Sequence, residues 1–65
     1  MTIRQVIQIQ ESIKRSLTKH QQSGDSNDML GLRLSGMIEG LQLVNELNDQ
    51  QALEIIIAMK NHFNF

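Results

Sequence analysis

The chain has 65 residues, a formal net charge of −1 and no cysteine, so disulfide bonds and cysteine metal sites are excluded. Six Lys and Arg against seven Asp and Glu give no overall attraction to nucleic acid or to an anionic membrane surface. Hydrophobic residues make up 40% of the sequence, which argues against disorder, and the absence of proline favours helices. We therefore expect a single all-α domain over residues 1–65.

The first predicted helix runs from about residue 3 to residue 21. Thr2 is a favourable N-cap, and Gln5 follows it by three residues, which is the spacing of a capping box. Apolar residues then recur at helical spacing: Ile3, Val6, Ile9, Ile13 and Leu17. The polar–apolar alternation of the opening residues leaves a weaker strand interpretation open.

The second predicted helix spans residues 27–47 and follows a short polar connection. Gly24 suits the left-handed end of the first helix, and Asp25 or Ser26 suits the N-cap of the second. Because the connection is so short, we expect the first two helices to lie antiparallel as a helical hairpin.

Apolar residues lie on two faces of this second helix. The first face consists of Leu30, Leu34, Met37, Leu41 and Val44. The second face, turned away by roughly 120°, consists of Leu32, Gly36, Gly40, Leu43 and Leu47. A small chain has little surface with which to cover both faces. We expect the first face to pack within the chain and the second to form a homodimer interface, although the two assignments could be exchanged.

Glycine is frequent in the same helix. Each glycine in a helix interior costs about 1 kcal/mol relative to alanine, so some compensating role is expected. Gly36 and Gly40 are one turn apart and would leave a notch that lets another backbone approach. The alternative interpretation is that these glycines are merely tolerated.

The third predicted helix covers residues 50–62 and is shorter than the others. Asn48 is a favourable N-cap with Gln51 three residues later, which again matches a capping box. Three consecutive isoleucines at 55–57 have strand propensity, but the flanking residues favour a helix. Since three consecutive side chains point in three directions around a helix, we expect this helix to be buried between its neighbours.

No pattern in the sequence predicts catalysis, a cofactor or a metal site. His20 and His62 are far apart and have no orienting carboxylate nearby in sequence, so we interpret both as surface residues. The amino-terminal residues do not resemble a signal peptide, and the longest apolar run, residues 55–59, is too short to span a membrane. We expect a cytoplasmic protein with no membrane partner.

Surplus apolar helix surface without catalytic chemistry is typical of an interaction protein. We therefore expect a non-enzymatic adaptor, inhibitor or small chaperone of the kind that bacteria and phages encode, with a homodimer and a further protein as partners. The alternative is a dimeric nucleic-acid-binding regulator that uses the basic side of the first helix. The basic side consists of Arg4, Lys14, Arg15 and Lys19, diluted by Glu11.

Overall fold

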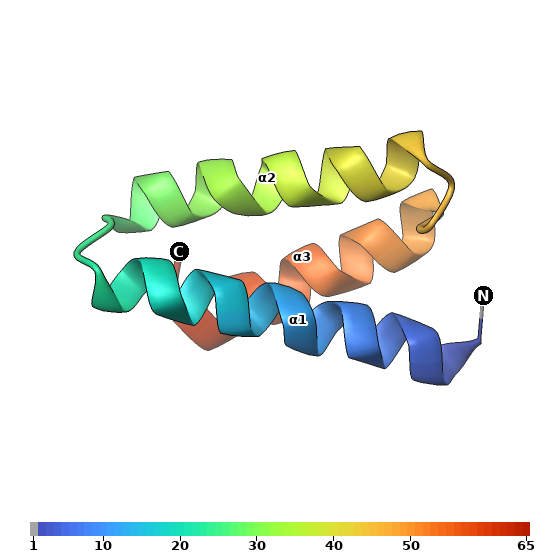
Figure 1. The fold of residues 1–65 in the computed structure, drawn as a ribbon, viewed down its shortest axis with the longest axis horizontal. Coiled ribbons are helices and arrows are strands. Elements are labelled where there is room, and N and C mark those ends of the chain that lie inside the picture. The colour runs from blue at the N-terminus through green and yellow to red at the C-terminus, as the bar shows by residue number, and fades with distance from the viewer. Residues whose placement is uncertain (1) are drawn as a thin grey trace.

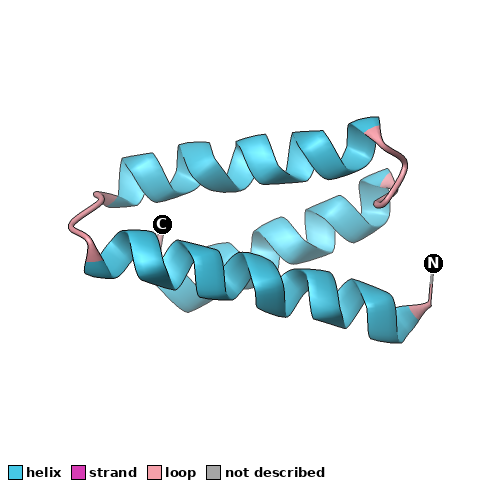
Figure 2. Ribbon diagram, viewed as in Figure 1, coloured by secondary structure: helices cyan, strands magenta, loops and turns pink. Residues whose placement is uncertain are grey.

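The structure is a computed structural model that describes residues 2–65, and these residues form three helices and no strand. The helices are α1 (Ile3–Gln22), α2 (Asn27–Leu43) and α3 (Asp49–Phe63), joined by two short loops (Figure 2). The expectation of an all-α fold is thus confirmed. Figure 1 shows the chain reversing after α1 and again after α2, and every helix packs against the other two. The bundle measures 33 × 20 × 16 Å along its principal axes.

Local side-chain hydrogen bonds define where each helix begins. At α1, the Gln5 amide donates to Thr2 Oγ1 at 3.2 Å and the Thr2 amide donates to Gln5 Oε1 at 2.8 Å. Asn48 and Gln51 form the same reciprocal pair at α3, with distances of 2.8 and 3.1 Å. Both predicted capping boxes are therefore confirmed. Ser26, rather than Asp25, caps α2.

The second helix ends at Leu43, four residues before its expected end. Asn45 adopts a left-handed conformation with φ of 60°, which a continuing α-helix does not allow. The Glu46 amide then donates to the carbonyl of Leu41 at 2.8 Å, a bond that closes the helix end. The chain bends here and carries Leu47 into the core, where it is only 4% exposed.

One apolar core lies between the three helices. Leu30 and Leu34 belong to it, as the sequence predicted, whereas Met37 and Leu41 are half-buried and Val44 is exposed. Ile38 is buried in the core, although it lies on neither of the two predicted faces. The buried core residues are Ile13, Leu17, Leu30, Leu34, Ile38, Leu47, Ala52, Ile55, Met59 and Phe63.

The third helix is covered on one side only, so the expectation that it is buried all round is wrong. Ile55 is fully buried and Ile56 is half-buried, whereas Ile57 is 51% exposed. Leu53, one turn before Ile57, is also exposed. Only two helices pack against α3, and they leave its third side uncovered.

Within residues 2–65, none of the helices combines the length and the hydrophobicity needed to cross a lipid bilayer.

Candidate interaction surface

The side of α2 that faces away from the core carries exposed apolar residues, with Glu39 and Asp28 along one margin. Leu32 and Leu43 are 68% and 83% exposed, and Met29 contributes a third large apolar side chain to the same side. Gly36 and Gly40 lie between them. The outer α2 surface, as we call it, consists of Met29, Leu32, Gly36, Gly40 and Leu43.

Four of the five predicted interface residues therefore share one exposed helix side, and the fifth does not. Leu47 lies in the loop after α2 and is buried in the core of the same chain. Met29 was missed by the sequence analysis. It precedes Leu32 by three residues and Gly36 by seven, so the helical period contained the signal needed to include it.

Gly36 and Gly40 leave the backbone of α2 uncovered. A Cβ atom built at either glycine would meet no other heavy atom within 4 Å. Gly31 differs, because a Cβ there would lie 3.9 Å from the Phe65 ring. The packing of this chain therefore does not require glycine at positions 36 and 40, and a role for the notch must involve something outside the chain.

An apolar groove of about 400 Å³ lies on the surface between α1 and α2, beside the two glycines. Its floor includes Ile13, which is buried, and Met37, which is half-buried. Every residue that lines it is uncharged: Ile9, Ser12, Ile13, Gly36, Met37, Gly40 and Leu41. The groove extends the outer α2 surface toward α1.

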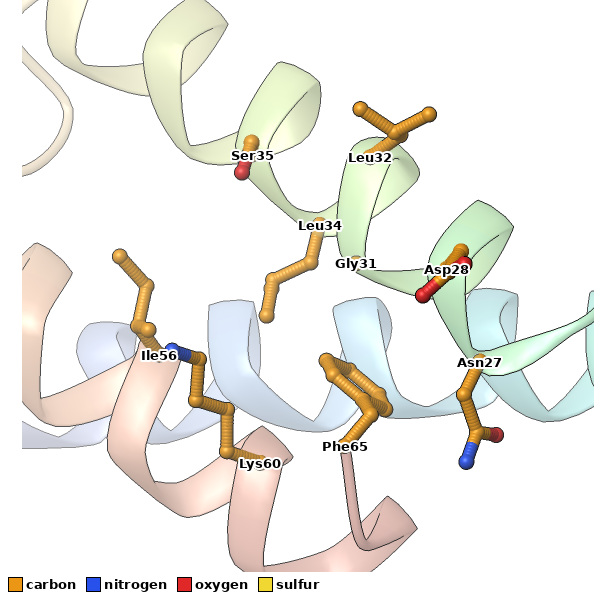
Figure 3. Close-up of a pocket in the computed structure, with 9 residues that line it drawn as sticks. All are labelled: Asn27, Asp28, Gly31, Leu32, Leu34, Ser35, Ile56, Lys60 and Phe65. Carbon is orange, nitrogen blue, oxygen red and sulfur yellow. The ribbon is translucent and has the colours of Figure 1, made fainter.

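A second groove of about 660 Å³ lies on the other side of α2, between α2 and α3 (Figure 3). Leu34 and Ile56 contribute apolar lining from the two helices, and the Phe65 ring lies beside Gly31. This groove carries charge, since Asp28 of α2 and Lys60 of α3 both line it. The outer α2 surface thus has an uncharged groove on one side and a charged groove on the other.

Polar contacts at both ends of α2 hold it relative to its neighbours. At its start, Asp25 accepts a hydrogen bond from Arg33 Nε at 2.7 Å, and Asn27 Nδ2 donates to the carbonyl of Asn64 at 3.5 Å. At its end, Gln42 Nε2 donates to Asp49 Oδ1 at 2.8 Å. These contacts link both ends of α2 to neighbouring segments, and burial of Leu30, Leu34 and Ile38 turns the opposite side of the helix to solvent.

The basic side of α1 is also exposed, but its cations are not all together. Lys14, Arg15 and Lys19 line one shallow depression along α1, together with Glu11. Arg4 lies ten residues before Lys14, which is about 15 Å along a helix. The structure therefore groups three of the four predicted nucleic-acid contacts and leaves Arg4 apart from them.

The two histidines do not form a joint site. His20 Nδ1 lies 3.7 Å from Asp25 Oδ2 at the end of α1, and the His62 ring packs edge-on against Phe63 with 4.7 Å between centroids. In the described part of the chain, no three His, Asp or Glu side chains converge as metal ligands. The Asp25 carboxylate beside His20 differs from the expectation that neither histidine has a carboxylate nearby.

No protein-family model, no curated protein and no solved structure matches the chain.

Proposed function

We propose that this protein is a non-enzymatic protein–protein interaction module that acts through the outer α2 surface, with a second copy of itself as one partner. The observation that carries the proposal is the exposure of Leu32 and Leu43 on the same side of one helix, with the open glycines between them. Isolated exposed leucines are ordinary, but an aligned apolar helix side is typical of a contact surface.

The energetics support association. Removing one such leucine side chain from water contributes roughly 1.5–3 kcal/mol, so covering two per copy is substantial for a domain of this size. The dimer that we propose is a helical bundle in which each copy contributes an antiparallel α1–α2 hairpin. An adaptor, inhibitor or small chaperone of this type acts by offering an apolar helix surface to an amphipathic helix of its partner.

A Gly40→Glu substitution tests this proposal. The space around the Gly40 Cβ position is open, and glutamate is a better helix former than glycine, so the monomer should fold at least as well as before. A carboxylate in the apolar contact would be costly to desolvate, so the variant should be monomeric. Analytical ultracentrifugation gives the mass, and circular dichroism gives the helix content.

The matched control is Asn61→Glu, which adds the same side chain at an exposed position on α3. We expect the wild type and this control to be dimers at about 100 μM, a concentration at which a micromolar Kd gives nearly complete association. A monomeric wild type, or a dimeric Gly40→Glu variant, would overturn the proposal.

A second candidate function is nucleic-acid binding by α1. Residues 3–22 hold four cationic side chains and one acidic side chain, for a net charge of +3, whereas residues 23–65 carry −4. Phosphate contacts are strongest at low salt, so binding to duplex DNA or to single-stranded RNA should be measured by fluorescence anisotropy at about 50 mM salt. Absence of binding there would eliminate this function, and binding that survives replacement of Arg15 and Lys19 by Gln would contradict the assigned surface.

A further inference from the structure

The two edges of the outer α2 surface differ in charge. Asp28 lies on the edge that faces α3, because it lines the groove shared with that helix. Glu39 follows eleven residues later, which returns a helix to within about 20° of the same direction. The opposite edge, where Met37 and Gly40 line the groove shared with α1, carries Arg33, which is paired with Asp25, and beyond it lies the positively charged α1.

A stable interface needs more area than the outer α2 surface offers alone. A typical specific interface covers about 800 Å² on each partner, which is about one sixth of the 4564 Å² surface of this chain. A helix of 17 residues is only about 25 Å long and about 10 Å wide. The contact must therefore reach past an edge of α2 onto a neighbouring helix.

Twofold symmetry allows two arrangements of a pair of α2 helices, and they bring different edges together. When the helices run antiparallel, the twofold axis is perpendicular to them. Each edge of α2 in one copy then faces the same edge of α2 in the other copy. The carboxylates Asp28 and Glu39 would then lie on the same side as those of the second copy. When the helices run parallel, the axis lies along them, so the α3-side edge of one copy meets the α1 side of the other.

We propose that two copies pair through parallel α2 helices, with Lys19 of each copy opposite Asp28 of the other. This proposal rests on the dimer proposed above and specifies its geometry. The charges favour this arrangement, because the acidic edge of α2 then faces the α1 helix that carries +3. Two like-charged edges meeting would instead oppose association.

The position of Lys19 makes it the cation best placed for this contact. Ser12 lines the groove beside α2, and Lys19, seven residues later, returns to nearly the same side of α1. His20 and Arg33 both contact Asp25, so the end of α1 lies beside the start of α2. Lys19 and Asp28 are therefore at the same end of the bundle, and a parallel arrangement keeps those ends together.

Cysteine cross-linking distinguishes the two arrangements, because the natural chain contains no cysteine. In the parallel pair, residue 32 faces residue 32 of the second copy, so the Leu32→Cys variant should form a covalent dimer under mild oxidation. In an antiparallel pair that crosses at Gly36 and Gly40, Leu32 instead lies at the level of Leu43 of the second copy, which is on the same outer α2 surface. In the parallel pair these two residues are about 16 Å apart along the helix axis, so a mixture of Leu32→Cys and Leu43→Cys chains should yield no mixed disulfide.

A dimer by sedimentation that forms only the mixed 32–43 disulfide would overturn the parallel arrangement and leave the interaction function intact. A wild type that stays monomeric would remove the interaction function itself. The two failures are therefore distinguishable in the same set of samples.

Charge reversal tests the contact between Lys19 and Asp28. Lys19→Glu and Asp28→Lys should each raise the Kd of the dimer about tenfold. Each substitution replaces two symmetry-related attractions with repulsions at the rim of the interface, where solvent partly screens the charges. The double variant should regain most of the wild-type affinity. Arg4→Glu, which makes the same reversal at the far end of α1, should have little effect. A double variant as weak as the two single variants combined would overturn the contact.

Discussion

Arg33 Nε lies 2.7 Å from Asp25 Oδ2, and this ion pair joins the first loop to the second turn of α2. His20 Nδ1 lies 3.7 Å from the same carboxylate oxygen. One carboxylate thus connects the last turn of α1, the loop and α2. Polar contacts at this end of the bundle therefore add to the apolar packing between the first two helices.

Replacing Asp25 with Ala should lower the free energy of unfolding by about 0.5–1 kcal/mol. The two side chains are 22% and 39% exposed, so the ion pair is partly screened by solvent and its contribution is modest. Urea denaturation of Asp25→Ala, Arg33→Gln and the double variant gives the coupling between the two residues. The coupling should shrink at about 1 M salt, and fully additive effects at low salt would contradict a direct interaction.

Leu34 and Leu32 are two residues apart on α2 and should respond oppositely to truncation. Leu34 is buried in the core, so Leu34→Ala should cost about 2–5 kcal/mol and leave little folded protein. Leu32 is exposed, so Leu32→Ala should change the stability of the monomer by less than about 0.5 kcal/mol. Thermal unfolding followed by circular dichroism at low protein concentration measures both. A large loss of monomer stability for Leu32→Ala would mean that this side chain is not exposed.

The start of each helix could be predicted from the sequence. Which face of α2 is buried could be predicted only in part. Side chains that cap a helix act within four residues, so Thr2 and Asn48 carry their full signal locally. The face that α2 buries depends on where α3 packs, which no local pattern encodes. Ile38 therefore joined the core unexpectedly, while Val44 is exposed.

The two apolar sides of α2 made the outer α2 surface predictable, and they also left open which of the two sides is buried. α1 and α3 pack against each other as well as against α2, so together they cover one side of α2 and leave its other apolar side open. Leu47 was misplaced because the left-handed conformation of Asn45 ends α2 early, and asparagine at a helix end is a weak signal. The exposure of Leu53 and Ile57 could not be predicted, because it depends on which sides of α3 the other helices cover.

Alanine at two of the glycines should have opposite effects on the monomer. Gly36→Ala places a methyl group in open space and removes the entropic cost of glycine, so it should stabilise the helix by about 1 kcal/mol. Gly24 has φ of +98°, which alanine adopts only with strain, so Gly24→Ala should destabilise by about 1–2 kcal/mol.

Urea denaturation at low micromolar concentration, below the range in which dimers form, separates these effects from association. Sedimentation at high concentration should then show weaker self-association for Gly36→Ala than for the wild type, because the methyl group holds the two backbones apart. Stronger association of this variant would argue against a close approach at the notch.

The bend after α2 should depend on Asn45. Its φ of 60° is easily adopted by glycine and less easily by alanine, so Asn45→Gly should maintain or raise the stability and Asn45→Ala should lower it by about 1 kcal/mol. In the alanine variant, residue 45 favours the helical conformation, so α2 can extend toward residue 47. This extension would move Leu47 out of the core. Amide hydrogen exchange should then report weaker protection of the α3 residues that pack beside Leu47, whereas the neighbouring Glu46→Ala control should leave that protection unchanged. Equal stability of the glycine and alanine variants would show that the left-handed residue does not determine where α2 ends.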